Sequence, residues 1–187
     1  MATRPAQTGW TYSEFARLPD DGNRYEVIAG ELHVTPAPRP RHELASQRLN
    51  KLLLNFVDEH DLGWVLTAPV DVLFAEGDYM EPDIVVVLRG GEKIITDRGI
   101  EGPPDLIVEV VSGATAARDR GIKRERYAHF GVPLYWIMDG ERRQMEVYPL
   151  QEDPQNPIIV RNTFTWTPAP DGLTLTISVP ELFRGFE

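Results

Sequence analysis

Three consecutive segments decide the fold of this chain: DLIVEVV (105–111), TAARDRGIKRERYAHF (115–130) and LYWIM (134–138). The first and third are nearly unbroken apolar runs of strand length, typical of strands that are buried on both faces of a sheet. The middle segment predicts a helix that ends at Gly131-Val132-Pro133. A strand, a helix and a second strand in this order predict a right-handed crossover between parallel strands.

The rest of the chain adds one long helix and several short strands. Apolar residues recur at helical spacing over 42–60, which predicts an amphipathic helix. A Gly-Asp pair between 70–74 and 82–88 predicts that these two strands form an antiparallel hairpin. Further elements are predicted at 11–18 (helix), 25–34 (hairpin) and 64–67, 144–148, 158–160, 164–166 and 173–177 (strands).

Together these elements predict an α/β fold. Its centre is a mixed β-sheet flanked by helices, and extra antiparallel strands follow at the C-terminus. The length suits a single core, so we expect one domain over 1–187. Within it we distinguish an N-terminal helix and hairpin (11–35), a central region (42–150) and a β-rich tail (151–187).

Composition excludes several classes of protein. Hydrophobic residues make up 42% and charged residues 26% of the chain, as in ordinary globular domains. The absence of cysteine excludes disulfides and cysteine-ligated metal sites, and it suits a reducing cytoplasm. No apolar run approaches the ~20 residues of a membrane span, and Met1–Trp10 lacks the apolar core of a signal peptide. We therefore expect a cytoplasmic protein with no membrane partner.

The net charge of −10 argues against a nucleic-acid partner, because proteins that bind nucleic acid are usually basic. Basic residues are nevertheless clustered over 114–130, where five Lys or Arg stand against two Asp or Glu. Arg118, Arg120 and Arg124 in this segment are candidates for phosphate contacts. A solvated helix face is the alternative interpretation.

Three charged residues lie inside or beside apolar runs. Asp83 directly precedes the apolar run 84–88, Glu109 lies within 105–111, and Lys123 lies on the helix that follows. Buried carboxylates cost free energy unless they are paired or bind a cation. A divalent cation shared by Asp83 and Glu109 is the simplest explanation, and oxygen ligands favour Mg²⁺ or Mn²⁺.

The chain contains several short motifs in a specific order and spacing. They are RYEVIAGEL (24–32), PRH (40–42), EPDI (81–84), PDLIVEVVS (104–112), Asp119, Lys123 with Tyr127, and GVPLYWI (131–137). This set resembles the PD-(D/E)xK nuclease superfamily and, more narrowly, the Uma-two restriction-endonuclease-like family of bacteria. Pro82-Asp83 matches the PD element, and Glu109 matches the second acidic residue. Val111 stands where the superfamily pattern has lysine, and the narrower family points to Lys123 instead.

The resemblance implies a restriction-endonuclease-like fold and a divalent-metal-dependent DNA endonuclease with its catalytic core in 42–150. Asp83, Glu109 and Lys123 are the implied catalytic residues. Mg²⁺, or Mn²⁺ as a substitute, is implied at Asp83, Glu109 and the Val110 carbonyl. Lys123 would orient a water molecule or stabilise charge in the transition state.

Two accessory residues also follow from the resemblance. Glu26 could add a ligand through a water molecule or bind a second metal, and His42 could contact a phosphate or the Glu26 side of the site. The alternatives are an exposed hairpin glutamate and a helix cap. Tyr127 and Trp136 are interpreted as core packing rather than as platforms for base stacking.

The catalytic residues have structural alternatives as well. Asp83 could cap a turn, and Glu109 could form a buried ion pair with Lys123. Lys123 could instead pair with Asp119 on a solvated helix face, at a gain of only ~0.3–0.5 kcal/mol.

The alternative function is a catalytically silent nuclease-fold module that binds nucleic acid or dimerises. A third is a metal-dependent hydrolase of some other phosphoester, since a fold does not fix a substrate. Exposed strand edges and the β-rich tail predict a homodimer, whose two sites would face the two strands of a duplex.

Overall fold

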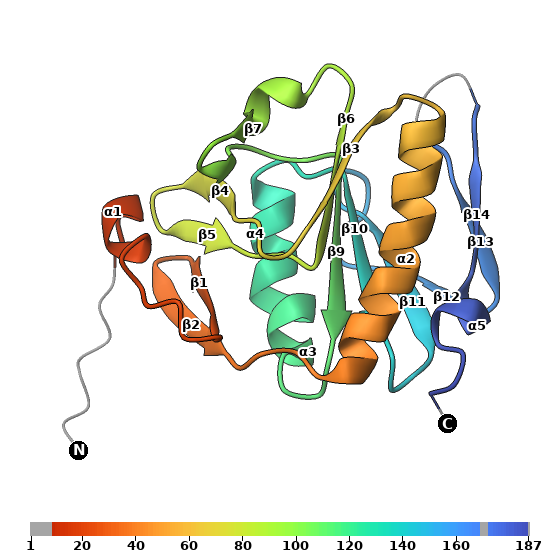
Figure 1. Cartoon of the computed structure of the whole chain (residues 1–187), viewed down its shortest axis with the longest axis horizontal. Helices are drawn as coiled ribbons and strands as arrows, with labels where there is room; N and C mark the ends of the chain where they lie inside the picture. The colour runs from red at the N-terminus through yellow and green to blue at the C-terminus, as the bar shows by residue number, and fades with distance from the viewer. Residues whose placement is uncertain (1–8, 169–171, 187) are drawn as a thin grey trace.

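The computed structural model describes residues 9–168 and 172–186. Most of the Met1–Trp10 segment, and the ends of the predicted 1–187 domain, therefore lie outside the described residues. Figure 1 shows the long helix α2 (Pro40–Glu59) on one side of the central strands, with helix α4 (Arg124–His129) and a second sheet on the other side.

The main sheet has six strands in the order β12-β11-β10-β9-β6-β3. Strands β9 (Leu106–Val111) and β10 (Leu134–Asp139) are parallel, and β6 (Ile84–Leu88) runs antiparallel to β9. These three strands are buried almost throughout, as their apolar runs predict. The outer strands are β3 (Gly63–Thr67), β11 (Gln144–Pro149) and β12 (Ile158–Val160).

The predicted crossover between parallel strands is confirmed, but its helix is broken. Helix α3 (Ala116–Arg118) leads into a π-helical turn, η2 (Asp119–Lys123), and α4 follows. Gly121 leaves helical geometry inside η2, with φ −102° and ψ −105°. The prediction of one continuous helix over 115–130 is thus corrected. Turns of this kind often mark functional sites, and η2 carries Lys123.

Alternation along β9 determines which way its one carboxylate faces. Val108 and its alternate neighbours face α2, which packs on this side of the sheet with Leu49 and Leu53. Ile107 belongs to the core cluster on the opposite side, which also contains Tyr127 of α4. Successive side chains of a strand point to opposite faces, so Glu109 faces the same side as Ile107. The carboxylate therefore points away from α2, towards α4 and the second sheet.

The second sheet also has six strands, in the order β2-β1-β5-β4-β8-β7. The predicted N-terminal hairpin is confirmed as β1 (Arg24–Ile28) paired antiparallel with β2 (Glu31–Thr35). The remaining elements of this part are β4 (Val72–Ala75), β5 (Asp78–Met80), β7 (Ile95–Thr96), β8 (Gly99–Ile100), the short helix α1 (Tyr12–Phe15) and the 3-10 turn η1 (Glu92–Ile94).

The predicted hairpin of 70–74 with 82–88 is wrong. Strand β4 pairs with β5 across a turn in which Gly77 has φ +84°, whereas β6 pairs with β3 and β9 in the main sheet. Pro82 has no backbone N–H to donate to a ladder, and the chain crosses from one sheet to the other at Glu81-Pro82-Asp83. This crossing places Asp83 where the two sheets meet.

The C-terminal part contains the extra antiparallel strands that the sequence predicts, β13 (Thr163–Trp166) and β14 (Leu175–Ser178). Helix α5 (Val179–Leu182) follows, and the Leu182 carbonyl accepts a 3.0 Å hydrogen bond from Arg48 of α2. Within residues 9–168 and 172–186, no helix has the length and apolar character that crossing a membrane requires.

Candidate active site

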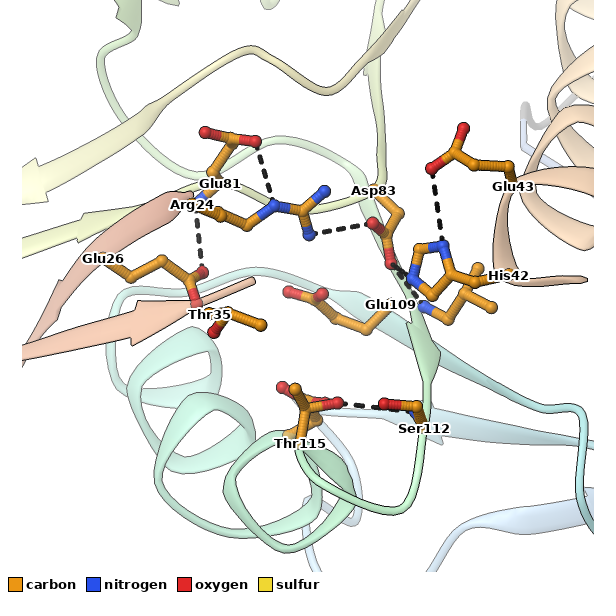
Figure 2. A network of polar contacts seen from close by, with 12 residues as sticks. Arg24, Glu26, Thr35, His42, Glu43, Glu81, Asp83, Glu109, Ser112 and Thr115 are labelled. Atoms are coloured by element: carbon orange, nitrogen blue, oxygen red, sulfur yellow. Dashed lines mark hydrogen bonds and ion pairs between the residues drawn. The ribbon is translucent and has the colours of Figure 1, made fainter. Parts of the chain in front are cut away.

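The register of β6 and β9 brings the two predicted carboxylates together. Ile84 lies opposite Val108, so Asp83, one residue before β6, reaches the level of Glu109. The Val110 N–H donates a 2.7 Å hydrogen bond to Asp83 Oδ2, which fixes the Asp83 carboxylate against β9. Figure 2 shows the Asp83 and Glu109 side chains converging on one space beside Glu26 and His42.

Lys123 reaches this space from η2. Its Nζ contacts Glu109 Oε1 and lies 2.7 Å from Glu26 Oε1 and 3.9 Å from Asp119 Oδ1. The lysine and all three carboxylates are buried. The alternative interpretation of Lys123, a solvated pair with Asp119, is therefore not what the structure shows. Both residues face inward, and Lys123 bridges the main sheet to the second sheet through Glu26.

Two basic side chains hold Asp83 from its other side. Arg24 Nη1 donates to Asp83 Oδ1 at 2.9 Å, while Arg24 Nε lies 2.9 Å from Glu81 Oε1. His42, in the first turn of α2, places Nε2 3.2 Å from Asp83 Oδ2. Asp83 thus has partners on β1, β9 and α2.

The two carboxylates that face each other differ in their ease of ionisation. Burial opposes ionisation of Asp83, but His42, Arg24 and the Val110 N–H outweigh burial and hold its pKa below the ordinary value. Burial raises the pKa of Glu109 to about 8; Lys123 opposes this rise, and the neighbouring carboxylates reinforce it. Asp83 is the more readily ionised of the pair, and an additional cation would favour ionised Glu109.

The neighbouring carboxylates favour the charged forms of the basic residues Lys123 and His42. Burial disfavours the charged ammonium of Lys123, but Glu109, Glu26 and Asp119 outweigh burial and raise its pKa. Burial likewise opposes charge on His42, and the hydrogen bond to Asp83 outweighs it, so the His42 pKa is raised. Lys123 is therefore charged at neutral pH and available to stabilise negative charge.

Tyr127 supports Glu109 from the core. It is fully buried, and its hydroxyl donates a 2.8 Å hydrogen bond to Glu109 Oε1. The interpretation of Tyr127 and Trp136 as core residues is confirmed, since Trp136 is buried in the cluster beneath α2. Tyr127 has in addition a direct role in orienting the Glu109 carboxylate.

The side chains described so far line a cavity of about 360 Å³. One wall carries residues of β1 and the 35–39 connector, and the opposite wall carries Arg118 and the 112–115 loop. Among the predicted residues, the lining includes Glu26, His42, Asp83, Glu109, Val110, Arg118 and Lys123.

Arg120 and Arg124 are not part of this lining. Arg120 binds Glu146 through Nε at 3.0 Å and Asp139 through Nη2 at 2.5 Å, and Arg124 donates to Gln155 at 3.0 Å. Of the three arginines predicted to contact phosphate, only Arg118 therefore lies at the cavity.

Arg24 lines the cavity but is not among the site residues that the sequence predicts. A signal was present, because Arg24 and Glu26 are two residues apart on one strand and therefore share a face. Asp119 is among the motif residues of the resemblance, but the only role that the sequence suggests for it is that of a solvated partner of Lys123. Its position four residues before a buried lysine could have indicated burial, but a single sequence does not reveal which face of a helix is inward.

Asp83 and Glu109 offer the chemistry that a hard divalent cation requires. In the described part of the chain, no group of three or more Asp, Glu, His or Cys side chains is arranged to hold a metal. Mg²⁺, however, commonly uses one or two carboxylates and completes its shell with water and phosphate. Glu26 Oε2 is buried beside this pair, where Arg118 Nη2 lies 3.2 Å away without forming a hydrogen bond. The donor set therefore fits Mg²⁺ or Mn²⁺ at Asp83 and Glu109.

The fold and the site define the class of protein, a restriction-endonuclease-like mixed sheet with two acidic residues and a lysine at one edge of its central strands. A crystal structure described as a "putative nuclease belonging to DUF820", from Anabaena variabilis, matches with a TM-score of 0.74. The match covers 93% of this chain and 97% of that chain at 19% sequence identity, which establishes a shared fold. The predicted restriction-endonuclease-like fold is thereby confirmed.

The family follows from the sequence itself. No curated protein matches the chain significantly. The profile of the Uma2 family, described as "Putative restriction endonuclease", matches residues 12–180. The chain therefore belongs to the Uma2 family, as the resemblance of its motifs indicated. The family description supports the coarser part of the expected function, that of a nuclease.

Proposed function

We propose that this protein is a divalent-metal-dependent DNA endonuclease that hydrolyses phosphodiester bonds at the cavity around Asp83, Glu109 and Lys123. One observation carries the proposal: residues from two strands and a separate helical turn converge, so that Lys123 contacts Glu109 while the Val110 N–H holds Asp83. The family description, a restriction endonuclease, supports nucleic acid as the substrate.

Each residue has a chemical task in the proposal. Asp83 and Glu109, with the Val110 carbonyl, bind Mg²⁺ or Mn²⁺, and the bound ion supplies a Lewis acid for the phosphodiester. Lys123 stabilises negative charge that develops on the phosphoryl oxygens. Glu26 keeps the Lys123 ammonium in place, and Tyr127 orients Glu109.

The phosphate contacts are assigned by position. Arg118 and Arg24 lie in the cavity wall and bind the substrate phosphate, with His42 beside them. The sequence also predicts phosphate contacts for Arg120 and Arg124. These two side chains bind Glu146 and Gln155 outside the cavity, which does not support that role.

The proposal also includes a homodimer in the cytoplasm. The edge strand β12 supports the dimer, because Ile158 and Ile159 are exposed there at the end of the main sheet. An unpaired edge with apolar side chains is suited to pairing with a second chain. The absence of cysteine supports the compartment. Sedimentation of wild type and of Ile158→Lys would measure the dimer, which the substitution should dissociate.

The test is cleavage of supercoiled plasmid and of a labelled single strand in Mg²⁺, in Mn²⁺ and in EDTA. Asp83→Asn and Lys123→Met should each lower the rate at least a hundredfold. The matched controls are Asp97→Asn and Lys51→Met, since both replaced side chains are exposed and lie outside the cavity. Controls should cut like wild type.

Three results would change the assignment. Cleavage that survives Asp83→Asn would identify a contaminating nuclease. Binding of Mn²⁺ by calorimetry without any cleavage would favour a silent nucleic-acid-binding module. Neither cleavage nor Mn²⁺ binding would show that the acidic pair serves the structure alone.

A further inference from the structure

The reactive groups of the proposed site are almost fully buried in a recessed cavity. The exposed fraction is 4% for Asp83, 3% for Glu109 and 1% for Lys123. A phosphodiester must therefore enter the cavity to reach them. The volume of about 360 Å³ lies at the low end of the roughly 300–1,000 Å³ typical of small-ligand pockets. The major groove of B-DNA alone is about 12 Å wide, so an intact duplex would have to lie across the mouth.

Polar contacts also join the two walls of the cavity. Arg118 Nη2, on the helical wall, donates to Thr35 Oγ1 on the hairpin wall at 2.9 Å and lies 3.2 Å from Glu26 Oε2. Deeper in the cavity, Lys123 makes a second tie to Glu26 at 2.7 Å. These charged contacts are largely buried, and breaking one partner of such a pair is costly. The two walls are thereby held at the separation the structure shows.

The charges around the cavity also argue against binding of an intact duplex. Binding to a duplex depends on neutralising several phosphates at once. The basic side chains of the lining are already engaged, Arg24 by Asp83 and Glu81, and Arg118 and Lys123 by Glu26. Within residues 9–168 and 172–186, Arg39 is the basic residue of the lining without a carboxylate at ion-pair distance. Arg39 is exposed at the mouth, in the connector between β2 and α2.

We infer that the site takes a single nucleic-acid strand, or an unpaired arm of a branched duplex, and does not act on an intact duplex. This inference rests on the proposed function and specifies its substrate. Enzymes that act on a base in a deep pocket take single strands or extrude a nucleotide; here the group that must enter the pocket is a backbone phosphodiester. In this protein a strand would enter past Arg39, with its scissile phosphate between Arg118, Lys123 and the two carboxylates.

The experiment compares one sequence in three forms: a labelled single strand, the same strand in a duplex, and a duplex that carries the sequence as an unpaired arm. Wild type is assayed with Mg²⁺ and with Mn²⁺, and cleavage positions are mapped. We expect the single strand and the unpaired arm to be cut at least tenfold faster than the duplex. Arg39→Ala should weaken single-strand binding by about tenfold, while Arg17→Ala, at an exposed site on α1's C-terminal side, should not.

The outcomes distinguish a failure of the single-strand inference from a failure of the proposed nuclease function. Cleavage of the duplex within its paired region, at a rate equal to or above that of the single strand, overturns the inference and leaves the nuclease assignment intact. Cleavage of no form overturns the proposed function, and the inference falls with it. Equal binding of single strand and duplex by the non-cleaving Asp83→Asn variant, measured by fluorescence anisotropy, also overturns the inference.

Discussion

Replacing Lys123 with methionine is the most direct perturbation of the site. Methionine keeps most of the aliphatic volume of the lysine side chain, so the substitution removes a charge without opening a large cavity. Lys123 is buried and contacts Glu109, Glu26 and Asp119. Its raised pKa means that, at neutral pH, the charge is fully present in the folded protein.

The cost can be estimated from these contacts. Removing one partner of a buried ion pair typically costs about 3–5 kcal/mol, because the remaining charge is left without compensation. Glu26 retains Arg118 as a partner and Glu109 retains the Tyr127 hydroxyl, which places the estimate at the lower end. At an m-value of about 2 kcal/mol per molar, the urea midpoint should fall by roughly 1.5–2 M.

Urea unfolding of Lys123→Met is measured beside wild type and Lys51→Met, first in EDTA and then in Mg²⁺. Lys51 is exposed on α2, so its substitution should leave the midpoint unchanged. Mg²⁺ should stabilise Lys123→Met more than wild type, since the cavity has lost a competing cation; a ligand at a hundred times its Kd adds about 2.7 kcal/mol. A Lys123→Met midpoint equal to that of Lys51→Met would refute the buried network.

Three further predictions concern neighbouring residues. Tyr127→Phe keeps the ring but removes the hydrogen bond to Glu109, which should cost about 1–2 kcal/mol in urea unfolding and slow cleavage, whereas loss of stability without slower cleavage would contradict an orienting role. Asp71 directly precedes β4, and burial raises its pKa to about 6 from 3.8. Its folded form therefore holds a proton more tightly than its unfolded form, and stability falls as pH rises from about 4 to 6. Asp71→Asn should therefore stabilise the protein by up to ~3 kcal/mol at pH 8, at roughly 1.4 kcal/mol per pKa unit, and by little at pH 4; equal gains at both pH values would exclude this cause. Arg120→Met should destabilise by about 3 kcal/mol through Glu146 yet leave the cleavage rate per folded molecule unchanged, and a selective loss of cleavage would instead restore Arg120 as a phosphate contact.

Much of the main sheet could be predicted from the sequence. The runs 84–88 and 105–111 are too apolar to be exposed, and the carboxylates beside and within them stand out for that reason. The strand–helix–strand order then limits β9 and β10 to a parallel pair. Because Lys123 lies on the connecting helix, its approach to Glu109 could be anticipated, and the structure brings the two together.

The second sheet could not be predicted in the same way. Strand β5 has only three residues, and a short alternating pattern does not identify its partner strand. The Gly-Asp pair therefore predicts a hairpin of 70–74 with 82–88, whereas β4 and β6 belong to different sheets. The position of Arg24 beside Asp83 depends on this same arrangement. The break in the helix at Gly121 could not be predicted from the sequence, because one glycine within a helical pattern is usually tolerated.

The contact between Glu26 and Lys123 has a consequence for the order in which the molecule assembles. Glu109 and Lys123 lie on one crossover and can meet early, since the chain between them is short. Glu26 arrives only when the second sheet docks, so the site is complete only after the long-range contacts have formed. Conversely, a local opening that detaches β1 would disable the site while the main sheet stays protected from hydrogen exchange. A chain that is only partly folded would thus carry no assembled cleavage centre.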